Sequence, residues 1–151
     1  MAQPQEQSHA SDNKALLEAV AENTEMGKNT LNQILTMTDD EPFRTELKRQ
    51  LNRYRELNQQ AHTGMAACGG EVKGQSAFAK VNTAMGIELK SLLDKSTRNF
   101  AEMLIQGSEM GVNDCITALR DYPLASPGAR TLAGQLQTFQ SDSAQRLREF
   151  L

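Results

Sequence analysis

Apolar residues recur every three or four positions along most of this chain, and that spacing places them on one face of an α-helix. Such stretches predict four long helices, over about 13–38, 41–68, 97–121 and 128–150. A shorter stripe predicts a further helix over about 76–93 and consists of Phe78, Val81, Met85, Leu89 and Leu92. The pattern of apolar and polar positions therefore predicts an all-α fold.

The connections between these helices predict how they pack. Short links join the first helix to the second and the third to the fourth, and a short link forces two helices into an antiparallel hairpin. The link between the second and third helices is longer, which suits neighbouring helices that run parallel. Two hairpins that bury their apolar faces against each other make a four-helix bundle. We expect residues 13–151 to form this single domain.

The N-terminal segment differs from the rest because it is polar and rich in Gln and Ser. It fits neither a signal peptide nor a transit peptide, so we expect residues 1–12 to be a disordered tail. No stretch reaches the roughly 18 apolar residues that a membrane-spanning helix requires. We therefore expect a cytoplasmic protein without membrane contact.

The chain also contains an internal repeat, which is strong evidence for a duplicated architecture. A shift of 84 residues superposes Thr24–Leu35 on Ser108–Leu119, and a shift of 85 superposes the second helix of each half. The matched positions are small residues on both inward faces and an aromatic residue in each second helix. These pairs are Thr24 with Ser108, Gly27 with Gly111, and Tyr54 with Phe139.

Mid-helix glycines on an inward face indicate close packing, because Gly costs about 1 kcal/mol relative to Ala inside a helix. We predict that Gly27 and Gly111 make room for Tyr54 and Phe139. The predicted narrow waist of the bundle consists of Thr24, Gly27, Tyr54, Ser108, Gly111 and Phe139.

Two hairpins related by an approximate two-fold axis and joined by a long crossover resemble the ferritin-like four-helix bundles. The stretch from Gly86 through Lys95 into Ala101–Ser108 is similar to a family of uncharacterised bacterial ferritin-like proteins, in which an additional helix sits within the crossover. The resemblance spans roughly Leu16–Leu151. It implies a ferritin-like fold with a short crossover helix.

Metal-dependent ferritin-like proteins imply a dinuclear iron or manganese site. Such a site takes one Glu from each of two helices and a Glu-x-x-His pair from each of the others. Glu25 and Glu109 occupy repeat-equivalent positions, where the single carboxylates belong. Each directly follows an inward-facing residue, so we expect both at the flank of the core.

The Glu-x-x-His pairs are missing from the second and fourth helices. Glu56 is followed three residues later by Gln59, and the fourth helix has Ser141 and Ala144 at the corresponding places. We therefore predict no dinuclear centre and no cofactor, which argues against oxidase, ferroxidase and iron-storage functions. The metal or redox alternative that stays open uses a non-standard ligand set of Glu25, Glu109 and His62.

Composition and charge limit the classes of binding partner that the sequence favours. The formal net charge is −3 with both signs mixed along the chain, so neither nucleic acid nor a membrane surface is favoured. Cys68 and Cys115 lack the number and spacing of a disulfide or zinc framework, and we expect free, buried thiols. We expect core filling by Met26, Met65, Met85, Met103 and Met110.

These features favour a non-enzymatic bundle that acts through contacts with a protein partner or as a homo-oligomer. A catalytic Cys-His or Ser-His pair within the folded segments would have to use His62, and its spacing does not favour one. A third possibility is a binder of a small apolar ligand, which requires an unfilled cavity near Gly27 and Gly111.

Overall fold

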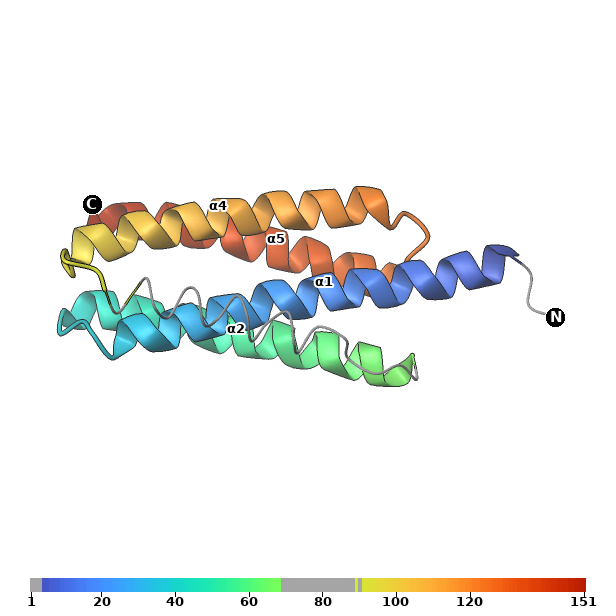
Figure 1. The fold of residues 1–151 in the computed structure, drawn as a ribbon, viewed down its shortest axis with the longest axis horizontal. Helices are drawn as coiled ribbons and strands as arrows, with labels where there is room; N and C mark the ends of the chain where they lie inside the picture. Colours follow the sequence, from blue (N-terminus) through green and yellow to red (C-terminus); the bar gives the residue numbers. More distant parts are fainter. Residues whose placement is uncertain (1–3, 69–88, 90) are drawn as a thin grey trace.

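Four long helices form a bundle in the computed structural model, which describes residues 4–68, 89 and 91–151 (Figure 1). The helices are α1 (Pro4–Leu35), α2 (Glu41–Ala67), α4 (Thr97–Asp121) and α5 (Pro127–Leu147), followed by a turn of 3-10 helix, η1 (Arg148–Phe150). These described residues include no strand. The predicted all-α fold and four-helix bundle are confirmed.

The helices pack as two antiparallel hairpins, α1 with α2 and α4 with α5. Between the hairpins, α1 packs against α4 and α5, and α2 packs against α5. As predicted, α2 and α4 run in the same direction, but they are not neighbours, because α4 lies along α1 and α5 (Figure 1). The expectation of neighbouring parallel helices is wrong because the hairpins meet with their first helices side by side.

The connection from α2 to α4 carries the predicted helix over 76–93. Most of that range lies outside the described residues, so this helix stays a prediction. Two residues of its apolar stripe are described: Leu89 is buried and Leu92 packs against the core. The C-terminal end of the predicted stripe therefore reaches the bundle.

The structure corrects the N-terminal prediction, because α1 begins at Pro4 and residues 4–12 are helical. Gln, Glu and Ala extend an existing helix at little cost, so a polar composition does not end one. The helix is also anchored here. The Asp12 carboxylate accepts the backbone N–H of Leu124 at 2.9 Å, and Asn13 Oδ1 accepts the Ser126 N–H and hydroxyl at 3.1 and 2.6 Å.

Side-chain caps fix the starts of the other three helices. Asp40, Ser96 and Ser126 each accept the backbone N–H three residues further on, at 3.2 Å in each case. Two of these caps also link the hairpins. The Ser126 hydroxyl donates to Asn13 Oδ1 at one end of the bundle, and the Thr97 hydroxyl donates to the Asp40 carboxylate at 2.8 Å at the other.

An arginine in the first turn of each second helix satisfies carbonyl groups at the end of the helix before it. In the first hairpin Arg44 donates to Leu35 and Thr38, and in the second Arg130 donates to Leu119 and Tyr122. Both hairpin turns are therefore closed in the same way.

One hydrophobic core draws on all four helices. Phe43 and Phe100 are its largest fully buried side chains, and the Phe43 ring meets Phe150 edge-on with ring centroids 5.2 Å apart. The contact with Phe150 ties the C-terminal turn to the start of α2.

The methionines divide between the core and the surface. Met65 is buried and Met103 packs against the core, as predicted, whereas Met26 and Met110 are 38% and 66% exposed. Met85 lies outside the described residues. The prediction of core filling is wrong for Met26 and Met110 because the phase of α1 and of α4 turns both outward.

The two cysteines also differ in burial. Both are free, and Cys115 is buried while Cys68 is exposed at the end of α2. The prediction of buried thiols is therefore right for Cys115 only, since Cys68 follows the last packed turn of its helix.

Candidate functional site

At the waist of the bundle, Gly27 makes room for Tyr54, as predicted. A Cβ atom at Gly27 would lie 2.5 Å from Cε1 and Cζ of the Tyr54 ring. Gly111 makes room for a different side chain from the one predicted, because it faces Gln140, whose Oε1 would lie 2.5 Å from a Cβ there. Both glycines are therefore sites of close packing, and the neighbour of Gly111 is Gln140 and not Phe139.

A one-residue error in register explains the difference. Tyr54 over Gly27 corresponds to Gln140 over Gly111, which is a shift of 86 residues between the second helices and not 85. The capping residues Asp40 and Ser126 are related by the same shift. One residue turns a helix by about 100°, so Phe139 points elsewhere.

Phe139 instead packs against Tyr54 across the α2–α5 contact. The ring centroids lie 4.9 Å apart and the rings meet edge-on at 81°. Edge-to-face geometry places the positive edge of one ring on the negative face of the other. The two predicted aromatic residues of the waist therefore meet each other.

Polar side chains link all four helices next to this ring pair. Gln140 Nε2 on α5 donates to the Tyr54 hydroxyl at 3.0 Å and to Asn23 Oδ1 at 2.6 Å. Asn23 Nδ2 on α1 donates to Gln140 Oε1 and to the Gly111 carbonyl of α4, both at 3.2 Å. It also lies 3.6 Å from the sulfur of Cys115. We call Asn23, Tyr54, Cys115 and Gln140 the central polar layer.

Burial keeps the two acidic groups of this layer protonated. It raises the pKa of Tyr54 to about 12, although hydrogen bonds with Gln140 and Ser108 act in the opposite direction. Burial also raises the pKa of the Cys115 thiol to about 12, with a further rise from the charge of Asp114. Because the thiolate is the nucleophilic form of cysteine, this burial disfavours the reactive form of Cys115. The layer acts chemically as a set of fixed hydrogen bonds between helices.

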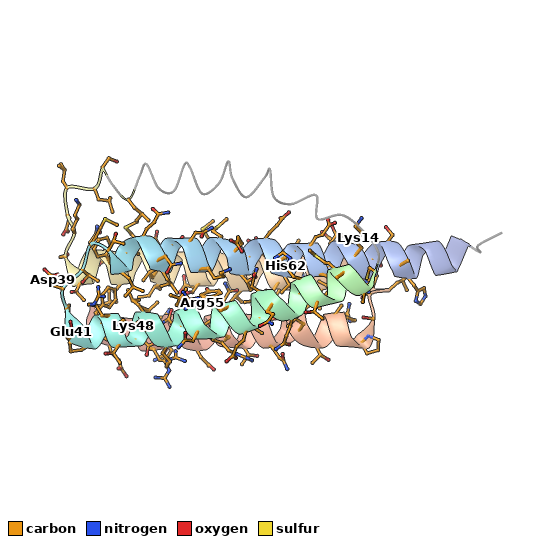
Figure 2. All side chains as sticks on the ribbon, turned by 90° about the horizontal axis from the view of Figure 1, so that it is seen from below. Lys14, Asp39, Glu41, Lys48, Arg55 and His62 are labelled. Atoms are coloured by element: carbon orange, nitrogen blue, oxygen red, sulfur yellow. The ribbon has the colours of Figure 1, made fainter. Side chains whose placement is uncertain are left out.

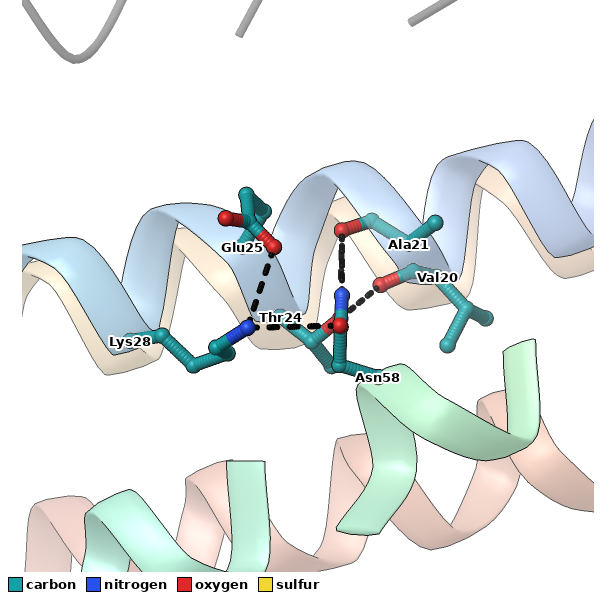
Figure 3. A network of polar contacts seen from close by, with 6 residues as sticks. All are labelled: Val20, Ala21, Thr24, Glu25, Lys28 and Asn58. Carbon is teal, nitrogen blue, oxygen red and sulfur yellow. Dashed lines mark hydrogen bonds and ion pairs between the residues drawn. The ribbon is translucent and has the colours of Figure 1, made fainter. Parts of the chain in front are cut away.

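A second polar cluster joins α1 to α2 (Figure 3). The buried Thr24 hydroxyl donates to the Val20 carbonyl at 2.8 Å and accepts from Asn58 Nδ2 at 2.9 Å. Lys28 Nζ lies 3.3 Å from Glu25 and 3.4 Å from Asn58 Oδ1. The predicted waist residue Thr24 is thus fully used in helix pairing.

The alternative metal ligands lie on three different helices, each with its own surroundings. Glu25 pairs with Lys28, Glu109 pairs with Arg148 at 2.7 Å, and His62 is half-buried on α2. No three His, Cys, Asp or Glu side chains among the described residues are grouped as a metal site. Glu25, Glu109 and His62 are all described, so the structure does not assemble this ligand set.

The cavity needed for an apolar ligand is filled at the predicted place, because Tyr54 and Gln140 occupy the space over Gly27 and Gly111. A small recess of about 10 Å³ lies elsewhere, between α1, α4 and α5. It is lined by Leu16, Ala19, Val20, Asn23, Asp114, Cys115, Ala118 and Ala133. A single water needs roughly 10–15 Å³ of such space, so the recess is too small for an organic ligand.

The outer side of the α1–α2 hairpin carries basic side chains. Lys48 and Arg55 are exposed, and neither forms an ion pair within the described part of the chain, whereas Arg49 and Arg53 pair with glutamates at 2.7 and 3.0 Å. Figure 2 shows Lys48, Arg55 and His62 in sequence along α2, with Lys14 on α1 beyond them. We call Lys48, Arg55 and His62 the basic row.

Asn23 and Gln140 are the residues of this region that sequence reasoning missed. A signal for Gln140 exists, because Leu136, Gln140 and Ser143 follow the four-and-three spacing of an inward face. All three are buried. A polar residue on an apolar face is a better marker of a buried hydrogen bond than the aromatic residue beside it.

No protein-family model matches the chain, and the searches of curated proteins and of solved structures likewise find no match. None of the described helices combines the length and apolar character needed to cross a membrane. The two candidate functional features of the described residues are the central polar layer and the basic row.

Proposed function

We propose that this chain is a non-catalytic, cytoplasmic helical-bundle protein that acts through contacts with other protein surfaces, a second copy of itself included. The observation that carries the proposal is the basic row. Lys48, Arg55 and His62 are spaced by seven residues, so they share one side of α2. Over 14 residues the row extends about 21 Å at 1.5 Å per residue.

Unpaired charges along a rigid helix favour an acidic partner. Complementary charge steers two protein surfaces together and fixes their orientation more than it adds affinity. Asp39 and Glu41 lie at the end of the same hairpin that is next to Lys48 (Figure 2). A second copy of this acidic chain offers carboxylates for the row, which is why self-association is the first contact to test.

We further propose that the bundle is a ferritin-like arrangement of two related hairpins. Three matched features support this. In each hairpin, a glycine of the first helix packs against a side chain of the second helix, and an arginine of the second helix closes the turn. The capping residue of each second helix also forms a hydrogen bond to the other hairpin. The helix over 76–93 belongs to the same proposal.

The experiment is sedimentation velocity of the full chain over a range of concentrations, at low and at high salt. We expect association that weakens as salt rises, because ionic strength screens exposed charges beyond about 10 Å at 0.1 M. The variant Lys48→Glu with Arg55→Glu should associate less than the parent protein at the same concentration.

Arg98→Glu with Arg120→Glu is the matched control, since it changes the net charge equally on α4 and should leave association unchanged. The proposal would be contradicted by a protein that is monomeric at every concentration and that retains no partner from lysate in a manner sensitive to Lys48→Glu and Arg55→Glu.

A further inference from the structure

The charges of α2 are unbalanced towards the positive side. Lys48 and Arg55 of the basic row are exposed and form no ion pair within the described part of the chain. The glutamates of this helix, by contrast, are all matched by a nearby arginine, in the pairs Glu41–Arg44 at 4.0 Å, Glu46–Arg49 at 2.7 Å and Glu56–Arg53 at 3.0 Å. The unmatched charge of α2 is therefore cationic.

The end of α5 together with η1 shows the opposite imbalance. Its arginines, Arg146 and Arg148, pair with glutamates of α2 and α4 at 3.5 and 2.7 Å. Asp142 and Glu149 are exposed and form no ion pair among the described residues. They are spaced by seven residues, so they lie on one side of this C-terminal segment. We call Asp142 and Glu149 the acidic row.

The basic row and the acidic row overlap in height along the bundle. α2 and α5 are antiparallel neighbours, and the ion pair of Glu46 with Arg146 shows which of their residues are level (Figure 1). By this register Lys48 is level with the middle of the acidic row, about one helical turn, or about 5 Å, from either carboxylate. Arg55 lies about one turn beyond Asp142. One face of the bundle therefore presents cations on α2 beside anions on α5.

Building on the proposed function, we propose that the basic row of one copy binds the acidic row of a second copy, and that the contact is reciprocal. A two-fold axis along the bundle, between α2 and α5, places α2 of each copy over α5 of the other at unchanged height. Each row then faces a row of opposite charge, and both contacts form together. Closed two-fold dimers are the commonest assemblies of identical chains.

The arrangement of the helices favours the acidic row over the carboxylates of α4. Asp114 and Asp121 are likewise exposed, spaced by seven residues and without an ion pair within the described ranges. However, α4 lies along α1 and α5 and is not a neighbour of α2. A single face of the bundle therefore does not present the basic row together with these two carboxylates, as a reciprocal contact requires.

Charge supplies most of this contact, because α2 and α5 present no large exposed apolar side chain. Among the described residues such side chains lie on α1, on α4 and outside the long helices, and they are Met26, Leu93, Met110, Leu124 and Leu151. Exposed ion pairs each contribute little. We therefore expect a weak dimer that dissociates as salt screens the charges.

The test is charge exchange, followed by sedimentation velocity of the full chain at low salt. Lys48→Glu with Arg55→Glu, and separately Asp142→Lys with Glu149→Lys, should each weaken self-association about ten-fold or more, because attractive contacts become repulsive. An equimolar mixture of the two double variants should associate again, since every row then meets a row of opposite charge.

Two controls separate this contact from a general effect of net charge. The variant that carries all four changes in one chain has the net charge of the parent protein, and it should self-associate because both rows are exchanged together. Asp114→Lys with Asp121→Lys makes the same change of net charge on α4 as the acidic-row variant makes on α5, and it should associate as the parent protein does.

Association that persists in Asp142→Lys with Glu149→Lys, or that the mixture does not regain, would overturn the reciprocal dimer and leave the basic row with a different acidic partner. A full chain that is monomeric at every concentration would also overturn the dimer. Association that is unaffected by Lys48→Glu with Arg55→Glu would contradict both the dimer and the proposed role of the basic row.

Discussion

Single residues at the waist set how closely the helices approach. At Gly27 and Gly111, side chains from the second helices occupy the space that a Cβ would need. Gly64 is a milder case, since a Cβ there would lie 3.0 Å from Cδ1 of Leu17, whereas Gly107 has open space around it. Two glycines that look alike in the sequence therefore respond to substitution in opposite directions.

Gly27→Ala should destabilise the protein by about 1–3 kcal/mol, because overpacking against the Tyr54 ring outweighs the gain in helix propensity. Gly107→Ala should stabilise it by up to about 1 kcal/mol, since only the propensity term remains. Urea denaturation of both variants measures the two changes. Equal effects would show that the Tyr54 contact does not limit this site.

The free energy of unfolding should fall as the pH rises from 9 towards 12. Tyr54 and Cys115 have pKa values of about 12 in the folded state, above their ordinary values of 10.0 and 9.0. The folded protein thus binds more protons than the unfolded chain in this range, and stability falls with pH. Denaturation midpoints at successive pH values check the slope.

Cys115→Ala should remove the part of this decline that begins near pH 9. Met65→Leu, a buried change without a titratable group, should lower stability by a similar amount at every pH. A decline of the same slope in Cys115→Ala would rule out Cys115 as its source.

At the scale of elements, the helix ends are joined by reciprocal caps. Asn13 of α1 bonds the cap of α5, and Thr97 of α4 bonds the cap of α2 at the opposite end. Each capping residue therefore accepts a backbone N–H of its own helix and also forms a hydrogen bond to the other hairpin. The relative register of the hairpins follows from these two links together with the central polar layer.

A double-mutant cycle of Asn13→Ala and Ser126→Ala should give a coupling energy of about 1 kcal/mol, because the two side chains bond directly. Asn13→Ala with Thr97→Ala serves as the control pair. These residues lie at opposite ends, so their effects should add within about 0.5 kcal/mol. Additivity in the first pair would contradict the link.

At the scale of the whole molecule, one core joins both hairpins. Neither hairpin buries its apolar face without the other, and the central polar layer takes groups from every helix. We therefore expect the hairpins to unfold together. The basic row lies outside this core, on the exposed side of α2, where the proposed contacts with other proteins would form.

Urea unfolding monitored by far-ultraviolet circular dichroism and by tyrosine fluorescence should give coincident transitions. Circular dichroism reports all the helices, and tyrosine fluorescence reports Tyr54 at the centre of the bundle and Tyr122 at the end of α4, so coincidence is the mark of two-state behaviour. Two separate transitions would mean that the hairpins are independent units.

The sequence by itself determined the elements of this protein. Apolar spacing and turn residues located α2 and α4 to within one residue, and the repeat identified Gly27 and Gly111 as sites of close approach. These features are local, since helical periodicity and the positions of turns depend on residues that are close together in the sequence. The helix over residues 4–12 was not predicted, because composition does not report the hydrogen bonds that anchor α1 at Asp12 and Asn13.

Only the tertiary structure decided which side chains meet. Gln140 and not Phe139 fills the space over Gly111, because a register error of one residue turns a side chain by about 100°. The hydrogen bonds of Asn23 reach residues 88 and 117 positions away, which no local pattern encodes. Likewise Met26 and Met110 are exposed because of the faces that α1 and α4 turn towards the core.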